Sequence, residues 1–160
     1  MIRIFICPKA TDKHTFSQEI AALLWNSSIE RATSGKPFLG SLNPRISISH
    51  TSIYWCVMAS DTECGVDIEL RSRKSSHLSR RFTTQEELSL CERVFAENPS
   101  LLVWCAKEAL FKYFSRTEVD FKKDLQITHA TPTSLEAEAF NQKVRLKWYT
   151  QGELLIVHSL

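Results

Sequence analysis

Four charged residues stand in two short apolar segments of this 160-residue chain, at spacings that suit chemistry on phosphate. Asp67 and Glu69 lie in the sequence Gly-Val-Asp-Ile-Glu, and Glu108 and Lys112 lie one helical turn apart further along. Mg²⁺ is usually held by one or two carboxylates together with waters and substrate phosphates. These residue types therefore indicate a divalent-metal site that handles phosphate.

The first segment is predicted to be a strand, because Val66 and Ile68 alternate with the two acids. Asp67 and Glu69 then point to one face, roughly 6.6 Å apart at the rise of a strand. That spacing lets two oxygens converge on one ion. An exposed strand face without any site is equally compatible with this pattern taken alone.

The second segment is predicted to be a helix, because apolar residues recur every three to four positions from Val103 to Phe114. Glu108 and Lys112 lie away from that apolar stripe. Taken alone, they are more typical of a solvated surface pair that stabilises a helix by about 0.3–0.5 kcal/mol. It is the combination with Asp67 and Glu69 that favours a site.

The surrounding pattern predicts the elements that must position these residues. Strands are expected at 2–7, 46–48, 53–58 and from Gly65, with the last two joined by a turn at 60–63 as a hairpin, helices between 76 and 115, and an antiparallel meander between 125 and 157. Thr84 and Glu87 match a capping box, and Pro99 suits the first turn of the next helix. This order predicts an α+β chain of two halves, residues 1–63 and 64–160.

Composition narrows the function classes. Hydrophobic residues make up 43% and charged residues 24% of the chain, as in ordinary globular proteins, and no apolar run approaches the length of a membrane span. A net charge of +2 is too small to indicate nucleic-acid binding, although residues 1–50 carry six Lys or Arg against three acids. The five cysteines include no Cys-x-x-Cys pair and are expected to be reduced core residues. Met1 to Cys7 also lacks the length and the small-residue cleavage site of a signal peptide, so a cytoplasmic location is predicted.

Five segments together resemble the 4′-phosphopantetheinyl transferase superfamily. They are Gly-Lys-Pro-Phe at 35–38, Ile-Ser-Ile-Ser-His at 46–50, Gly-Val-Asp-Ile-Glu at 65–69, Phe-Thr-Thr-Gln-Glu at 82–86, and the stretch from Trp104 to Lys112. The resemblance implies two pseudo-twofold-related α+β halves with antiparallel sheets and the active site between them. Within the superfamily, the chain resembles the two-half, surfactin-synthetase-activating type. Its first half is shortened, since only 34 residues precede Gly35.

The resemblance implies transfer of the phosphopantetheine arm from coenzyme A to a serine of an acyl or peptidyl carrier protein. It implies Mg²⁺, with Mn²⁺ as an alternative, held by Asp67, Glu69 and Glu108, while Lys112 contacts a phosphate. Glu108 is the first candidate for the general base. Glu86 acting through a water is the second, because a bound cation lowers the pKa of a carboxylate and weakens it as a base.

The same resemblance implies that Lys36, Ser49 and His50 bind the nucleotide of coenzyme A around its 3′-phosphate. Longer family members place several further basic residues before the Gly-Lys-Pro segment. In this chain Lys13, His14 and Arg31 are the candidates for that role.

Carrier proteins commonly present an acidic helix, so a basic cluster is a candidate docking surface, although such a cluster is more often merely solvated. That cluster follows Glu69 and consists of Arg71, Arg73, Lys74, Arg80 and Arg81. Whether the carrier serves fatty-acid or secondary-metabolite synthesis is not encoded in these motifs. Neither nucleic acid nor a membrane is an expected partner.

Two other functions are compatible with parts of the pattern. A non-catalytic module for coenzyme A or a nucleotide would keep the fold without turnover, although the three carboxylates with Lys112 argue against a purely binding role. An unrelated metal phosphohydrolase would be expected to show a second metal cluster, and the sequence has none.

Overall fold

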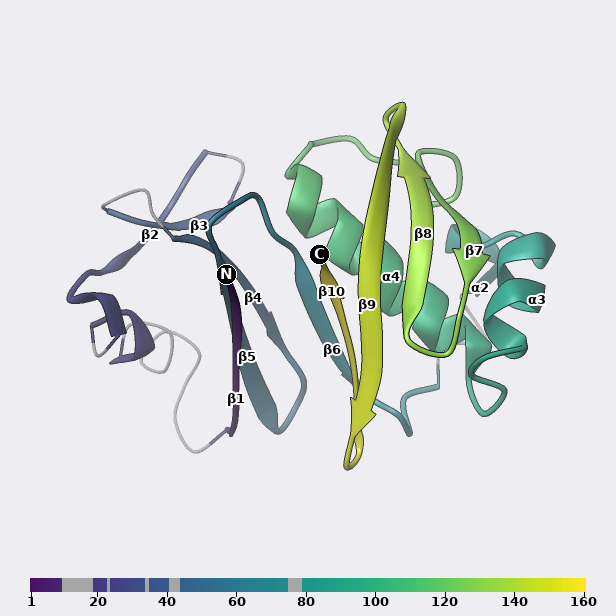
Figure 1. The fold of residues 1–160 in the computed structure, drawn as a ribbon, viewed down its shortest axis with the longest axis horizontal. Helices are drawn as coiled ribbons and strands as arrows, with labels where there is room; N and C mark the ends of the chain where they lie inside the picture. Colours follow the sequence, from purple (N-terminus) through teal and green to yellow (C-terminus); the bar gives the residue numbers. More distant parts are fainter. Residues whose placement is uncertain (10–18, 23, 34, 41–43, 75–78) are drawn as a thin grey trace.

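The described part of the chain forms three antiparallel sheets and a small number of helices, so the α+β class is confirmed (Figure 1). The computed structural model describes residues 1–9, 19–22, 24–33, 35–40, 44–74 and 79–160. Lys13 and His14, which are candidates for nucleotide binding in the sequence, lie outside the described residues.

The strands are β1 (Ile2–Pro8), β2 (Ile29–Arg31), β3 (Pro37–Leu39), β4 (Arg45–His50), β5 (Tyr54–Ser60), β6 (Val66–Leu70), β7 (Leu125–Ala130), β8 (Ser134–Ala139), β9 (Gln142–Gln151) and β10 (Leu154–Ser159). The helices whose bounds lie within the described residues are α2 (Ser79–Phe82), α3 (Gln85–Glu92) and α4 (Pro99–Phe114), and residues 19–22 and 24–25 are also helical. One sheet has the order β1-β5-β4, a second has the order β6-β10-β9-β8-β7, and β2 pairs with β3.

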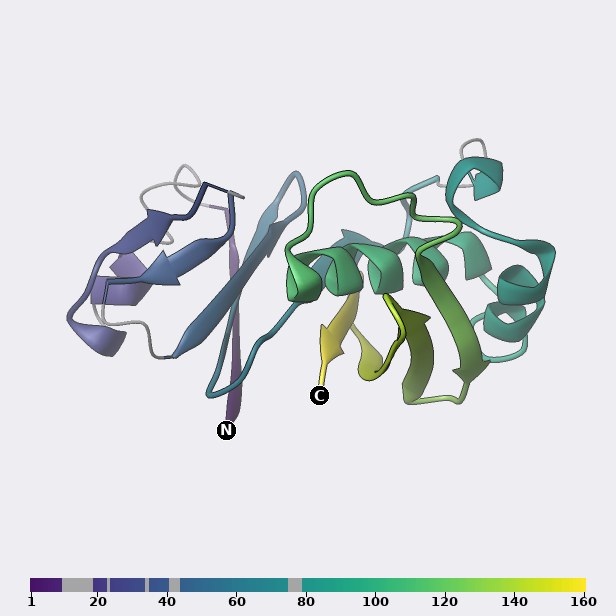
Figure 2. The same cartoon turned by 90° about the horizontal axis from the view of Figure 1, so that it is seen from above.

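The main core lies between α4 and the five-stranded sheet. Figure 2 shows α4 lying along one face of this sheet, with α3 beyond its end. Leu101, Leu102 and Leu110 of α4 pack in one buried cluster with Leu146 and Leu155 of the sheet. The predicted apolar stripe of the helix therefore faces the core, and removing this surface from water is the main stabilising contribution.

The local signals near α3 and α4 are confirmed. Thr84 caps α3 by accepting from the backbone N–H of Glu87, while the Glu87 carboxylate accepts from the N–H of Thr84. Pro99 is the first residue of α4. The alternating residues after 125 form the predicted meander, β7 to β10.

The predicted hairpin between β5 and β6 is wrong. β5 pairs with β1 and β4 in the first sheet, whereas β6 pairs with β10 at the edge of the second. Between β4 and β6 the contact runs through side chains, because Ser47 accepts from the N–H of Val66 and Ser49 accepts from the N–H of Ile68. Residues 61–65 thus cross from one sheet to the other, and the site lies at this junction.

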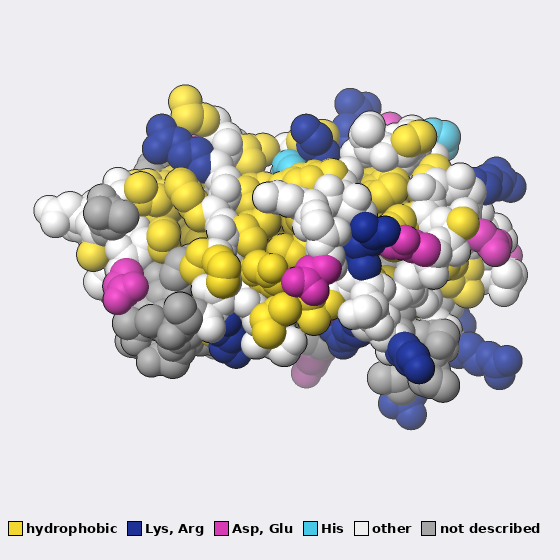
Figure 3. Space-filling view, turned by 90° about the horizontal axis from the view of Figure 1, so that it is seen from below, with side chains coloured by type: hydrophobic (Ala, Val, Ile, Leu, Met, Phe, Trp, Pro, Cys, Tyr) yellow, Lys and Arg dark blue, Asp and Glu magenta, His cyan; other side chains and the backbone are white. Residues whose placement is uncertain are grey.

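A second apolar cluster fills the far side of the junction. Ile68 and Ile156 of the five-stranded sheet pack there with Met58 of the first sheet, and Ile4 and Tyr54 continue the cluster toward the surface. Figure 3 shows hydrophobic side chains gathered across the middle of this face, with Lys and Arg spread around them. The two sheets are therefore joined by a hydrophobic contact as well as by the serine hydrogen bonds.

Candidate active site

Gly65 sets the distance between β6 and α4. A Cβ atom at this position would lie 2.0 Å from the carbonyl oxygen of Ala109 and 2.8 Å from the backbone nitrogen of Tyr113. Both are helix backbone atoms, which cannot move aside as a flexible side chain would. Only glycine lets the strand with Asp67 approach the helix with Glu108 this closely.

One pocket of about 290 Å³ brings most of the predicted site residues together. β4 contributes Ile48, Ser49 and His50, β6 contributes Asp67 and Glu69, and α4 contributes Trp104, Glu108 and Lys112. Three segments that are distant in the sequence thus converge at the junction of the two sheets.

Asp67 is buried at the centre of this pocket. Its Oδ1 atom accepts hydrogen bonds from the Ser49 hydroxyl at 2.7 Å and from Lys112 Nζ at 2.8 Å. Its Oδ2 atom is also buried, yet it has no hydrogen-bond partner among the described residues. A buried carboxylate oxygen without a partner is costly, so this atom is poised to receive a ligand.

Glu69 is held by two groups from outside its strand. Its Oε1 atom forms an ion pair with Arg73 and accepts from the indole N–H of Trp104 at 3.3 Å. The Glu69 side chain is only 12% exposed, so the alternative of a solvent-facing strand edge does not apply to it. The Trp104 ring itself packs against Phe82 and Phe121.

Glu108 faces Asp67 across the pocket. Burial raises the pKa of Glu108, and the negative charge of Asp67 raises it further, while Lys112 and Arg73 oppose both effects. A carboxylate with a raised pKa is a better proton acceptor than an ordinary glutamate. The helix therefore presents a group suited to general-base chemistry.

The donor set fits a hard divalent ion. The pocket offers three carboxylates, and the buried Oδ2 atom of Asp67 is not used by the protein. Within the described parts of the chain, however, no three His, Cys, Asp or Glu side chains already converge on one point. Lys112 and Arg73 instead supply the positive charge next to Asp67 and Glu69.

Lys36 and Glu86 lie outside this pocket. Lys36 forms an ion pair with Glu63 and lines a neighbouring cavity of about 200 Å³, which it shares with Lys112 and with Arg31. Glu86 is exposed in the first turn of α3, where hydrogen bonds from the backbone N–H of Glu86 itself and from Thr84 lower its pKa. Its proposed role as general base remains a prediction without a contact to the site.

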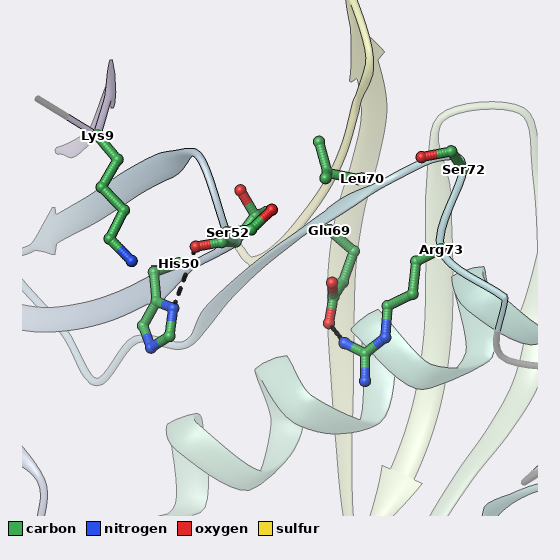
Figure 4. Close-up of a pocket in the computed structure, with 8 residues that line it drawn as sticks. Lys9, His50, Ser52, Glu69, Leu70, Ser72 and Arg73 are labelled. Carbon is green, nitrogen blue, oxygen red and sulfur yellow. Dashed lines mark hydrogen bonds and ion pairs between the residues drawn. The ribbon is translucent and has the colours of Figure 1, made fainter.

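His50 borders the pocket and a larger cavity next to it. Its ring packs edge-on against Trp55 with centroids 4.7 Å apart. The larger cavity, of about 430 Å³, is also lined by Lys9, Glu69 and Arg73 (Figure 4). Ser49, in contrast, directs its hydroxyl to Asp67 and β6, so within the described structure it orders the junction.

Two contacts near the site were not expected from the sequence. Lys107 is fully buried beside Glu108, and its Nζ atom lies 2.7 Å and 2.8 Å from the two carboxylate oxygens of Glu87. Arg73 was expected on a docking surface, but it pairs with Glu69, and Arg71 likewise pairs with Glu97. The spacing of Thr84 and Glu87 predicted the helix cap, but it did not predict that Glu87 also pairs with Lys107.

Comparison with known families agrees with this geometry. A family model of the 4′-phosphopantetheinyl transferase superfamily matches residues 63–156, which include Asp67, Glu69, Glu108 and Lys112. A search of curated proteins gave no match. No helix in the described part of the chain is long and apolar enough to cross a membrane.

Proposed function

The chain belongs to the 4′-phosphopantetheinyl transferase superfamily, and on this premise we propose that it acts on coenzyme A and a carrier protein. It transfers the 4′-phosphopantetheine group to a serine of an apo acyl or peptidyl carrier protein and releases adenosine 3′,5′-bisphosphate. The observation that carries this proposal is the convergence of Asp67, Glu69, Glu108 and Lys112 on one pocket.

Asp67, Glu69 and Glu108 are the residues that would hold the metal ion. Mg²⁺, or Mn²⁺ in its place, would supply positive charge against the negative charge that grows on the pyrophosphate. The unpartnered Oδ2 atom of Asp67 supports this assignment, because an ion would satisfy it. An oxygen-only donor set also matches the preference of Mg²⁺.

Glu108 is the proposed general base, because it lies in the pocket with Asp67, Glu69 and Lys112, where the carrier serine would approach the bound phosphate. It takes the proton of the carrier serine while the serine oxygen forms a new bond to the phosphorus attached to pantetheine. The bond between that phosphorus and the bridging oxygen breaks, and the nucleotide leaves with the electron pair. The transfer therefore needs no oxidant and no further co-reactant.

Lys112 is the proposed cation for a phosphate oxygen of the substrate. Its Nζ atom is held by the carbonyl oxygen of Val66 at 3.0 Å and by Asp67, and its side chain is 24% exposed. It is therefore fixed in direction and still open to a ligand. His50 shares the pocket with Lys112, and Lys36 shares the neighbouring cavity of about 200 Å³ with it, so both residues are proposed to contact the nucleotide.

The experiment that tests this function is intact-mass spectrometry of apo carrier proteins incubated with the protein, coenzyme A and Mg²⁺. We expect a mass gain of one phosphopantetheine on a carrier, which EDTA and the Asp67→Asn variant both abolish. A matched control is Asp124→Asn, which removes a carboxylate that does not line the pocket. If several carriers gain no mass while coenzyme A still binds, the non-catalytic binding module is the better description.

A further inference from the structure

The ion pair between Arg73 and Glu69 occupies a carboxylate that the proposed metal site needs. Both partners use defined atoms, Nη1 of Arg73 and Oε1 of Glu69. The Arg73 side chain is 47% exposed, so it has room to leave, whereas Glu69 is largely buried. A divalent ion bound through this oxygen would have to displace the guanidinium.

The backbone of Arg73 is held in place by hydrogen bonds to its surroundings, while its side chain is partly exposed. Its backbone N–H donates to the carbonyl oxygen of Leu70 at 2.8 Å, and its carbonyl oxygen accepts from the side-chain amide of Asn98 at 2.9 Å. The guanidinium lies 5.5 Å from the centre of the Trp104 ring, the same ring that donates to Glu69. The turn after β6 is thus fixed to the start of α4, with Arg73 aimed at the site.

On its other side Arg73 faces the cavity of about 430 Å³. Figure 4 shows Arg73 joined to Glu69 on one side of this cavity, with Lys9 and His50 across from them. Lys9 also lies 4.7 Å from the centre of the Trp55 ring. An anionic group in this space would meet Lys9 and His50, and it would meet Arg73 as well once Glu69 were taken by a metal ion.

We propose that Arg73 exchanges partners. Without a metal ion it neutralises Glu69, and when a divalent ion takes Glu69, its guanidinium turns to a phosphate group of the bound nucleotide in this cavity. The proposal rests on the proposed function for the metal and the coenzyme A nucleotide. Its consequence is a coupling between the two sites, in which each ligand strengthens the binding of the other.

The exchange predicts opposite effects of one substitution on two ligands. Arg73→Ala removes the competitor for Glu69, so Mn²⁺ alone should bind about 1.4-fold to fivefold more tightly, the range for a partly exposed ion pair. The same variant loses a charge-assisted hydrogen bond to phosphate. Adenosine 3′,5′-bisphosphate, measured with saturating Mn²⁺, should therefore bind about tenfold more weakly.

Isothermal titration calorimetry of both ligands tests this, with Arg73→Lys as the conservative variant and Lys74→Ala as the control. Lys74→Ala removes one positive charge from the adjacent exposed residue and should change neither affinity, while Arg73→Lys should stay close to the unmodified protein. Weakening of both ligands by Arg73→Ala would indicate a merely structural role and overturn the exchange. Unchanged affinities would overturn it as well, while leaving the proposed function intact.

The two proposals fail in distinguishable ways. If the unmodified protein binds neither Mn²⁺ nor the nucleotide, the proposed function loses its basis and the exchange falls with it. If it binds both and modifies a carrier, but Arg73→Ala shows no opposite shift, only the exchange is refuted.

Discussion

The buried ion pair between Lys107 and Glu87 gives the most quantitative prediction. Lys107 is 0% exposed and Glu87 is 3% exposed. Lys107 also donates to the carbonyl oxygen of Phe121 at 2.9 Å, and Glu87 accepts from the backbone N–H groups of Thr84 and Ile127. This network joins α3, α4 and β7, and α4 carries Glu108 and Lys112.

Lys107→Met keeps most of the side-chain volume and removes the charge. Burial lowers the pKa of Lys107 and the hydrogen bond that Lys107 donates to Glu87 opposes this, so Glu87 is the partner that makes a buried ammonium tolerable. Removing one member of a buried pair leaves an uncompensated charge and typically costs about 3–5 kcal/mol. For a chain of this length, that cost corresponds to a fall in Tm of about 6–20 °C.

Urea denaturation followed by tryptophan fluorescence measures this cost, with Lys123→Met as the matched control. Lys123 is 81% exposed and pairs with Asp120 at 3.6 Å, so its loss should cost less than about 0.5 kcal/mol. The double variant with Glu87→Gln should cost less than the sum of the two single variants, because neither charge is then left alone. A cost for Lys107→Met as small as that of Lys123→Met would refute the reasoning.

Three further predictions concern the site itself. Gly65→Ala should fold poorly or lose roughly 3 kcal/mol or more of its free energy of unfolding, because its Cβ would clash with the backbone of α4. Thermal denaturation would detect this loss, with Gly152→Asn at a tolerant turn as the control. A Tm of Gly65→Ala within 2 °C of the unmodified protein would speak against this close approach. Glu108→Gln should abolish transfer yet raise Tm in EDTA at pH 7.5. Tm should rise because the folded protein raises the pKa of Glu108, so the ionised carboxylate lowers stability at pH values above its ordinary pKa of 4.5. The advantage of the variant should therefore shrink as the pH falls toward 4.5. A lower Tm for the variant at pH 7.5 would contradict this prediction. Asp67→Asn should weaken Mn²⁺ binding at least tenfold in calorimetry, since it removes the charge beside the unpartnered oxygen, and unchanged affinity would place the ion elsewhere.

Local signals in the sequence predicted the local parts of the fold. The capping box at Thr84 and Glu87 and the start of α4 at Pro99 depend on neighbouring residues alone, and both are present. The alternation around Asp67 and Glu69 likewise placed both acids on the face that lines the pocket. These patterns are readable because the periods of strands and helices are fixed by backbone geometry.

Contacts between elements that are distant in the sequence were harder to predict. The turn residues at 60–63 are compatible with a hairpin, but β6 instead pairs with β10, which lies more than 80 residues later, and binds β4 through serine side chains. The contacts of Lys107 with Glu87 and of Arg73 with Glu69 also depend on how whole elements pack. A charged residue at a predicted helical position gives no sign of whether a partner from another element will bury it.

The pocket at the junction of β4, β6 and α4 is where we expect the metal ion and coenzyme A to bind, and locating a bound ion tests this expectation. Anomalous diffraction from crystals grown with Mn²⁺ and coenzyme A would show the position of the metal without reference to activity. We predict one manganese peak within coordination distance of Asp67, Glu69 and Glu108, with the pyrophosphate of coenzyme A next to Lys112. A manganese ion bound elsewhere, or a nucleotide that does not contact this pocket, would contradict the account.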